Sequence, residues 1–171
     1  PADLKVQDET VMKVEHLTRA GKFEDVSFEL KKGEVLGIAG MLGAGRTELL
    51  RSLFGVDGYD SGQITINGQP MNRKATPEQM KRKGMGLTPE ERKNQGVILI
   101  HSIRDNLCNA CLDKISDHHV INLRRRKDFA ERQVDELQIK VPSLTAAVGS
   151  LSGGNQQKVV IGNWLNTDPT I

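Results

Sequence analysis

A short apolar run that leads directly into a glycine-rich loop and then a helix constrains this chain more than any other feature. Residues 35–40 (VLGIAG) are apolar without interruption, which is typical of a strand buried on both faces of a sheet. Residues 40–47 (GMLGAGRT) form the loop, and leucines at positions 49, 50 and 53 predict a helix with an inward apolar face that ends at Gly55. A buried strand, a glycine loop and a helix in this order predict the start of a phosphate-binding α/β domain.

The loop at residues 40–47 fits the phosphate-binding pattern G-x-x-x-x-G-K-[ST] at every fixed position except one. Glycines allow the tight fold that turns backbone N–H groups toward phosphate oxygens, and the following helix adds the positive end of its dipole. The Thr47 hydroxyl is suited to Mg²⁺, and the cation before it neutralises the β- and γ-phosphates. That cation is Arg46 where lysine is expected, so the pattern predicts nucleotide binding and leaves the efficiency of hydrolysis open.

A second glycine motif follows at residues 151–158 (LSGGNQQK). A serine hydroxyl and glycine N–H groups at the start of a helix form an anion site of the same kind. Either motif alone is also compatible with a ligand-free turn or helix N-cap, at Ser152 or Asn155 in the second motif. Together and in this order they resemble the phosphate loop and the signature, usually written LSGGQ, of ABC ATPases. The resemblance implies that the signature contacts the γ-phosphate held by the phosphate loop of an opposite domain.

The segment between the motifs narrows the family. Residues 89–93 (PEERK) place Glu90 where ABC ATPases carry the Q-loop glutamine, which reaches Mg²⁺ and the attacking water and connects to the membrane subunit. The combination of GAGRTEL, PEERK and LSGGNQQK resembles the second nucleotide-binding half of the tandem ATPases that drive bacterial monosaccharide importers of the ribose, galactose and xylose type. The resemblance covers about residues 11–169 and implies ATP and Mg²⁺ as cofactors.

The resemblance assigns the site residues by their place in these motifs. The nucleotide-binding residues that it implies are Gly40, Gly43, Ala44, Gly45, Arg46, Thr47, Glu48, Ser152, Gly153, Gly154 and Gln156. Thr47 and Glu90 are the implied metal-site residues, and Glu90 is also the catalytic candidate at the Q-loop position. The usual adenine-stacking aromatic is missing between the first two strands, where Arg19 is a candidate substitute and Phe23 is expected in the core.

The implied fold is α/β: a P-loop NTPase core of the ABC ATPase type with an antiparallel β subdomain and an α-helical subdomain, truncated before the Walker B strand. Residues 11–101 are assigned to the β subdomain and phosphate-loop core, 102–151 to the helical subdomain, and 152–171 to the signature helix and the start of the Walker B strand. Because the Walker B aspartate and glutamate are absent from the chain, we expect no ATP turnover by this chain alone. An unpaired sheet edge predicts self-association or partial disorder near the C-terminus.

Short-range patterns predict the remaining elements. Strands are expected at residues 11–17, 25–30, 63–67 and 85–89, and helices at residues 76–84, 102–138 and 155–165. Asn67 and Gly68 form a strong two-residue hairpin turn. Thr76, Pro77 and Gln79 mark a capped helix start.

Composition argues against several classes of function. With 37% hydrophobic and 27% charged residues and a net charge of +2, the chain has an ordinary soluble composition and no charge argument for nucleic acid. No run approaches the roughly 20 apolar residues of a membrane-spanning helix, so any tie to a membrane runs through another protein. The basic residues 124–127 precede acidic ones and predict a solvated helix face. Cys108 and Cys111, without a second pair, predict reduced thiols on one helical face rather than a redox or metal site.

The resemblance implies an energy-coupling subunit. It binds ATP and drives uptake of a small sugar through a membrane permease, with a second ABC ATP-binding domain as its other partner and no nucleic acid. Its implied place is the cytoplasmic face of the bacterial inner membrane, as a peripheral protein. The alternatives are a degenerate regulatory half-site, suggested by Arg46 and Glu90, the same type of subunit for a nucleoside, and a soluble ABC protein of translation or DNA repair.

Overall fold

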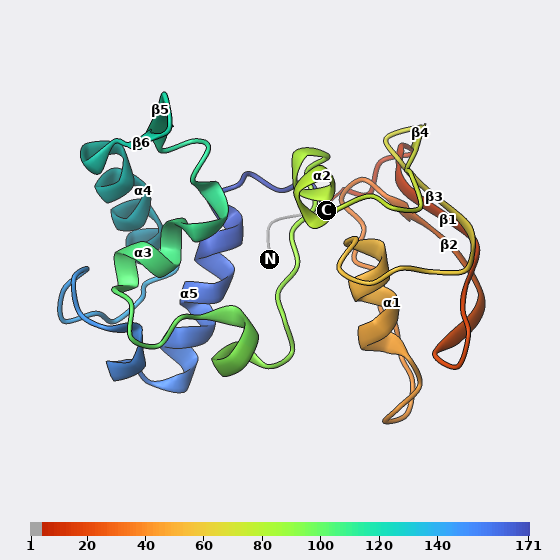
Figure 1. The fold of residues 1–171 in the computed structure, drawn as a ribbon, viewed down its shortest axis with the longest axis horizontal. Helices are drawn as coiled ribbons and strands as arrows, with labels where there is room; N and C mark the ends of the chain where they lie inside the picture. The colour runs from red at the N-terminus through yellow and green to blue at the C-terminus, as the bar shows by residue number, and fades with distance from the viewer. Residues whose placement is uncertain (1–4) are drawn as a thin grey trace. The chain divides into compact units, whose positions relative to one another are not determined.

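The computed structural model describes residues 5–171, which divide into two compact units (Figure 1). The sheet unit contains the residues up to Met85 together with Ile171, and the helical unit is Gly86–Thr170. Across the described residues, no helix has the length and apolar character needed to cross a membrane.

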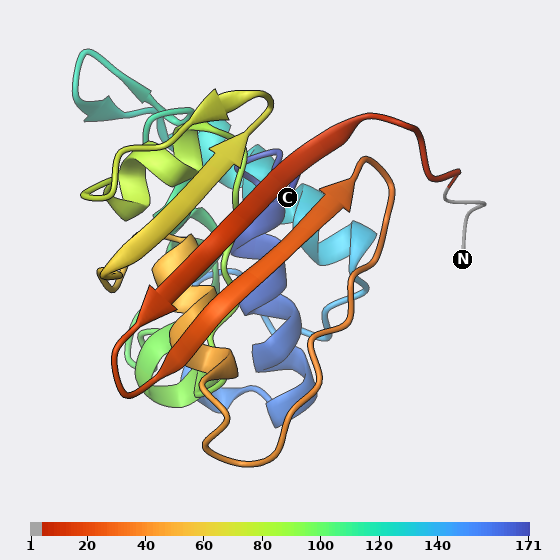
Figure 2. The ribbon, with the colours of Figure 1, turned by 90° about the vertical axis from the view of Figure 1, so that its right-hand side faces the viewer.

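The sheet unit is built on a four-stranded antiparallel sheet in the order β2-β1-β3-β4. Its strands are β1 (Thr10–Arg19), β2 (Phe23–Lys31), β3 (Ser61–Ile66) and the short β4 (Gln69–Pro70). Figure 2 shows β1 between β2 and β3, with α1 behind the sheet. The strands predicted at residues 11–17, 25–30 and 63–67 are confirmed and are longer than or shifted slightly from their expected bounds.

The core of the sheet unit lies on one face of β1 and β3. Met12 of β1 is paired with Ile66 of β3, and Val14 with Ile64, and all four side chains are buried. Cross-strand apolar pairs of this kind stabilise a sheet because their side chains pack on the same face. In β2, apolar and polar side chains alternate as predicted, and the apolar ones are half-buried.

Two local predictions in the sheet unit are confirmed. Asn67 and Gly68 have φ angles of 48° and 72°, as required by the two-residue turn that joins β3 to β4. Helix α2 (Pro77–Arg82) begins with a complete capping box, in which the Thr76 hydroxyl accepts from the Gln79 N–H and the Gln79 side chain accepts from the Thr76 N–H. Gly84 follows the helix with a φ of 85°.

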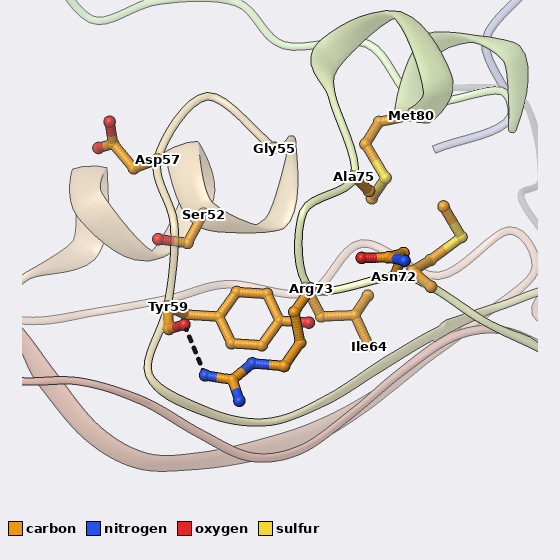
Figure 3. A pocket seen from close by; sticks show the side chains of 10 residues that line it. Ser52, Gly55, Asp57, Tyr59, Ile64, Asn72, Arg73, Ala75 and Met80 are labelled. Carbon is orange, nitrogen blue, oxygen red and sulfur yellow. Dashed lines mark hydrogen bonds between the residues drawn. The ribbon is translucent and has the colours of Figure 1, made fainter.

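A small cavity between α1, α2 and β3 is lined by ten residues, among them Arg73 and Tyr59 (Figure 3). The Arg73 guanidinium lies 5.7 Å from the centroid of the Tyr59 ring and donates to the Tyr59 carbonyl at 3.1 Å. The cavity has a volume of about 10 Å³, room for about one water molecule, so it is too small for an organic ligand.

The two predicted strands at residues 35–40 and 85–89 are wrong. Both segments are irregular, and Val35 is 85% exposed. A parallel strand exists only through hydrogen bonds to its neighbours, and within residues 5–171 no strand pairs with either segment.

The helix predicted after the loop is confirmed as α1 (Arg46–Leu53), and Gly55 follows its end. Leu49 and Leu53 are buried as expected, but Leu50 is 43% exposed.

The helical unit packs three α-helices around one apolar core. These are α3 (Ile103–Cys108), α4 (Leu123–Glu136) and α5 (Gly153–Leu165), the last of which confirms the helix predicted at residues 155–165. Shorter turns flank them: the π-helical η1 (Arg92–Gly96) and the 3₁₀ turns η2 (Asn109–Cys111) and η3 (Val148–Ser150). Gly162 of α5 allows a close helix contact, because a β-carbon there would lie 2.8 Å from the Leu107 side chain.

The uninterrupted helical region predicted at residues 102–138 is wrong in its middle. A hairpin of β5 (Ser116–Asp117) and β6 (Val120–Ile121) separates α3 from α4. Its turn residues His118 and His119 have φ angles of 48° and 68°. The pair His118-His119 is not one of the Asn-Gly, Asp-Gly or Gly-Gly pairs that usually mark a two-residue hairpin turn, so the sequence pattern did not reveal this hairpin.

Two of the side-chain predictions for the helical unit concern its cysteines and its basic run. Cys108 and Cys111 are free thiols in the core, and the hydrogen bond between them together with burial raises the pKa of Cys108. Among the described residues, no His, Cys, Asp and Glu group is suited to hold a metal ion. Within the basic run, Arg125 pairs with Asp117 at 3.1 Å and Arg126 with Asp105 at 2.9 Å, while its other two members are exposed.

Candidate functional site

The glycine loop is held in its shape by backbone contacts that only glycine permits. Gly43 and Gly45 have φ angles of 81° and 79°, and a β-carbon on Gly45 would lie 2.1 Å from the carbonyl oxygen of Lys22. The Ala44 N–H donates to the Met41 carbonyl at 3.1 Å and closes the turn. Gly45 is the N-cap of α1, so the loop delivers the chain directly to a helix start whose first N–H groups lack partners within the helix.

The charged residues around this helix start differ in how they are engaged. Arg46 is exposed, its side-chain stem lies against Gly40, and among residues 5–171 it forms no ion pair. Thr47 is exposed beside it. The carboxylate of Glu48 bonds to its own backbone N–H and to Lys22 at 3.3 Å, and both contacts lower its pKa. The start of α1 therefore presents backbone donors and one unpaired guanidinium, a combination suited to a phosphate group.

The second motif also opens a helix and leaves its hydroxyl exposed. Ser152 is the N-cap of α5, but its side chain makes no capping bond to the helix backbone. Asn155 holds it instead by donating to the Ser152 hydroxyl at 3.1 Å, while its carbonyl accepts from the Lys140 N–H. A β-carbon on Gly154 would have nothing within 4 Å, so this part of the loop is open to a ligand.

Comparison with known proteins identifies the family. Residues 23–171 match the ABC transporter family. This chain belongs to that family. It is 46% identical over 157 residues to ribose import ATP-binding protein RbsA 2 of Streptomyces coelicolor, covering 92% of this chain and 30% of that protein. It is 43% identical over 166 residues to the galactose/methyl galactoside import ATP-binding protein MglA of Clostridium tetani, covering 95% and 33%. The chain thus spans about a third of the length of these relatives.

Solved structures support the ABC ATPase cassette fold with its antiparallel β subdomain. A dimeric ATP-binding cassette in a post-hydrolysis state with ADP and Pi matches with a TM-score of 0.73 at 20% identity, over 92% of this chain and 70% of that one. An Atm1-family ABC exporter with ATP bound matches with a TM-score of 0.71 at 23% identity, over 96% and 28%. At this level of identity the likeness establishes the fold alone.

Within this ABC domain, Gln156 of the signature lies under the loop rather than on its surface. It is 5% exposed, and its side-chain amide donates to the Leu151 carbonyl at 3.0 Å and to the Val148 carbonyl at 3.5 Å. The sequence predicts Gln156 as a nucleotide contact. In the structure its amide bonds to the backbone that leads into the signature.

The Q-loop position and the residues after it lie in the helical unit with the signature. Glu90 is exposed and lies two positions before Arg92, the first residue of η1. Arg92, two positions further on, was given no role by sequence reasoning, although it belongs to the PEERK motif that marked the family. Its Nε donates to Gln156 Oε1 at 3.5 Å, a contact across 64 positions that no local pattern reveals.

The adenine-stacking candidate Arg19 is engaged elsewhere. Its Nη1 donates to Asp57 Oδ2 at 2.9 Å, and Arg51 donates to the same carboxylate at 2.8 Å. The two guanidiniums, Arg51 foremost, hold the pKa of Asp57 at about 2. Phe23, expected in the core, is half-buried. The structure therefore does not single out Arg19 or Phe23 as the residue that stacks on the adenine base.

Proposed function

We propose that this chain is the nucleotide-binding domain of an ABC importer, which binds ATP with Mg²⁺ and couples its hydrolysis to uptake of a small sugar through a membrane permease. The observation that carries this proposal is the presence, in one ABC domain, of an open glycine loop at a helix start and an open signature loop at another. The sugar is inferred from relatives that are named for import of ribose and galactose.

The predicted site residues at the centre of the proposal bind phosphate, hold the metal ion or belong to the signature. In this proposal the backbone around Gly43 and Gly45 wraps the phosphates, Arg46 neutralises their charge, and the Thr47 hydroxyl would hold Mg²⁺. Glu90, at the Q-loop position, is proposed separately as a catalytic and metal-site residue. Mg²⁺, when bound with ATP, screens the charge that develops on the phosphates during transfer. Ser152 and the glycines of the signature face the nucleotide held by a second ABC domain.

The proposed setting is a tandem ATPase at the cytoplasmic face of a bacterial inner membrane, with this chain in its second half. The motifs GAGRTEL and PEERK support this position, and so do relatives about three times as long as the chain. The partners are the other ABC domain and the permease. The Walker B carboxylates that this mechanism needs are not among the 171 residues, so we expect no steady-state ATP turnover from this polypeptide alone.

The test is ATP binding by the full-length protein with Arg46→Ala, measured by titration calorimetry in the presence of Mg²⁺. We expect this site to disappear from the binding isotherm, because the exposed guanidinium that faces the phosphates is gone. Lys74→Ala is the matched control, since it removes an exposed cation from the same unit and is expected to leave binding unchanged. Equal binding by wild type and Arg46→Ala would contradict the proposed role of the loop.

A degenerate regulatory half-site is the second candidate, favoured by the engagement of Arg19 with Asp57 and by the arginine at position 46. Arg46→Lys in the full-length protein separates the two. A rise in ATP turnover at this site would support the degenerate half-site. Unchanged turnover would show that arginine already suffices.

A further inference from the structure

The segment that follows Glu90 is bonded directly to the segment that leads into the signature. The Gly149 N–H donates to the Leu99 carbonyl and the Val148 N–H to the His101 carbonyl, both at 3.0 Å. A β-carbon on Gly149 would lie 3.0 Å from the same Leu99 oxygen, so the two backbones are in close contact. The chain that follows the Q-loop position and the chain that precedes the signature are therefore joined by backbone hydrogen bonds within the helical unit.

Arg92 extends this connection to the signature glycines themselves. A β-carbon on Gly153 would lie 2.7 Å from Arg92 Nη2, so the guanidinium rests against the first residue of α5. The same guanidinium donates from Nε to Gln156, whose amide in turn holds the Leu151 carbonyl. Arg92 thus touches the signature on both sides of Gly154.

The position is unusual for a cation. The start of a helix carries partial positive charge, which disfavours a guanidinium there, and among residues 5–171 no carboxylate pairs with Arg92. The backbone holds it in place nonetheless: a β-carbon on Gly96, at the end of the same turn, would lie 2.8 Å from the Val160 side chain of α5. The turn η1 is therefore pressed onto α5, with its arginine against the signature.

We propose that Arg92 is a positioning residue for the signature loop, acting through Gln156 and the backbone of Gly153. It fixes the loop in the geometry that faces the nucleotide of the opposite domain, and it transmits the position of the Glu90 segment to that loop. The proposal rests on the proposed function of the signature. Its chemistry calls for arginine, because a guanidinium can approach Gly153 through Nη2 while its Nε donates to the Gln156 amide, which a single lysine ammonium cannot do.

The test is steady-state ATP hydrolysis by the full-length protein with Arg92→Ala. We expect kcat to fall on the order of tenfold, because small displacements of positioned groups are costly in rate. The affinity for ATP and the melting temperature are expected to stay at wild-type values, because the phosphate loop and the apolar core are untouched. Lys93→Ala is the matched control, since Lys93 is an exposed cation on the same turn, and it is expected to keep wild-type kcat.

Two further variants test the route of action. In a double-mutant cycle, Arg92→Ala with Gln156→Ala is expected to lower kcat no further than the worse single variant, because both act through one contact. Arg92→Lys is expected to stay near the alanine variant. Additive losses, or a lysine variant with wild-type kcat, would overturn positioning through Gln156.

Failure of this inference is distinguishable from failure of the proposed function by including Ser152→Ala. If Ser152→Ala lowers kcat while Arg92→Ala does not, the signature works and the inference about Arg92 is wrong. If wild type shows no ATP hydrolysis, or if Ser152→Ala has no effect on it, the proposed function of the loop itself is wrong, and with it the inference.

Discussion

Arginines in this chain show how far a residue's role depends on partners that sequence alone does not supply. Arg46 belongs to a local pattern, so a part in a phosphate loop can be proposed for it from its neighbours alone. Arg19 could not be placed in this way, because its partner Asp57 lies 38 positions away. Arg92 was missed for the same reason, since Gln156 is further still. Residue types in a motif are predictable, whereas contacts between distant segments need the fold.

The carboxylate shared by Arg51 and Arg19 predicts a pH dependence of stability. The pKa of Asp57 is about 2 in the folded chain against 3.8 for an ordinary aspartate, so its contribution is present above pH 4 and is lost as the pH falls toward 2. We expect Asp57→Asn to lower the free energy of unfolding at pH 7 by about 2 kcal/mol and to remove this part of the acid dependence. Urea unfolding followed by circular dichroism from pH 7 to pH 2 measures both effects.

Glu24→Gln is the control for this measurement, because Glu24 is an exposed carboxylate of the same unit. It is expected to leave the unfolding curve in place. If Asp57→Asn and wild type lose stability in parallel between pH 4 and pH 2, the ion pairs do not contribute as described.

Elements of secondary structure were predicted correctly where the residues that determine them lie close together in the sequence. The Asn67-Gly68 turn and the Thr76 capping box were predicted correctly, because each depends on residues within one turn of the chain. The strand expected at residues 35–40 was wrong, because a parallel strand needs a hydrogen-bonded neighbour. The β5-β6 hairpin was missed because its turn residues, His118 and His119, are not one of the glycine-containing pairs that usually mark such a turn.

The capping box of α2 gives a prediction at this scale. Thr76→Ala removes the hydroxyl that accepts from the Gln79 N–H, so we expect the free energy of unfolding to fall by about 1 kcal/mol. Thr76→Ser keeps the hydroxyl and is expected to retain most of the stability. Urea unfolding of both variants provides the measurement, and equal stability of the alanine and serine variants would show that the cap contributes nothing.

At the scale of the whole molecule, the most consequential feature is an apolar segment whose side chains are exposed to solvent. Val35 lies in the run at residues 35–40 that the sequence predicted to be a buried strand, and Met41 and Leu42 follow it in the glycine loop. All three are among the most exposed side chains of the sheet unit. The apolar pattern and the exposed structure are reconciled if this segment is buried only when another strand pairs with it. An exposed apolar segment favours association between chains.

We therefore expect the 171-residue chain to self-associate with increasing concentration, and Val35→Glu combined with Met41→Glu to shift it toward monomer. The charges oppose burial of the segment in a contact between chains, while they face solvent in the monomer and cost it little stability. Sedimentation velocity over a concentration series measures the shift. Val120→Glu is the matched control, because Val120 is an exposed apolar residue of the helical unit and lies outside the run. A control that dissociates the chains as well as the paired substitutions do, or a wild-type chain that stays monomeric throughout, would show that residues 35–42 do not form the contact.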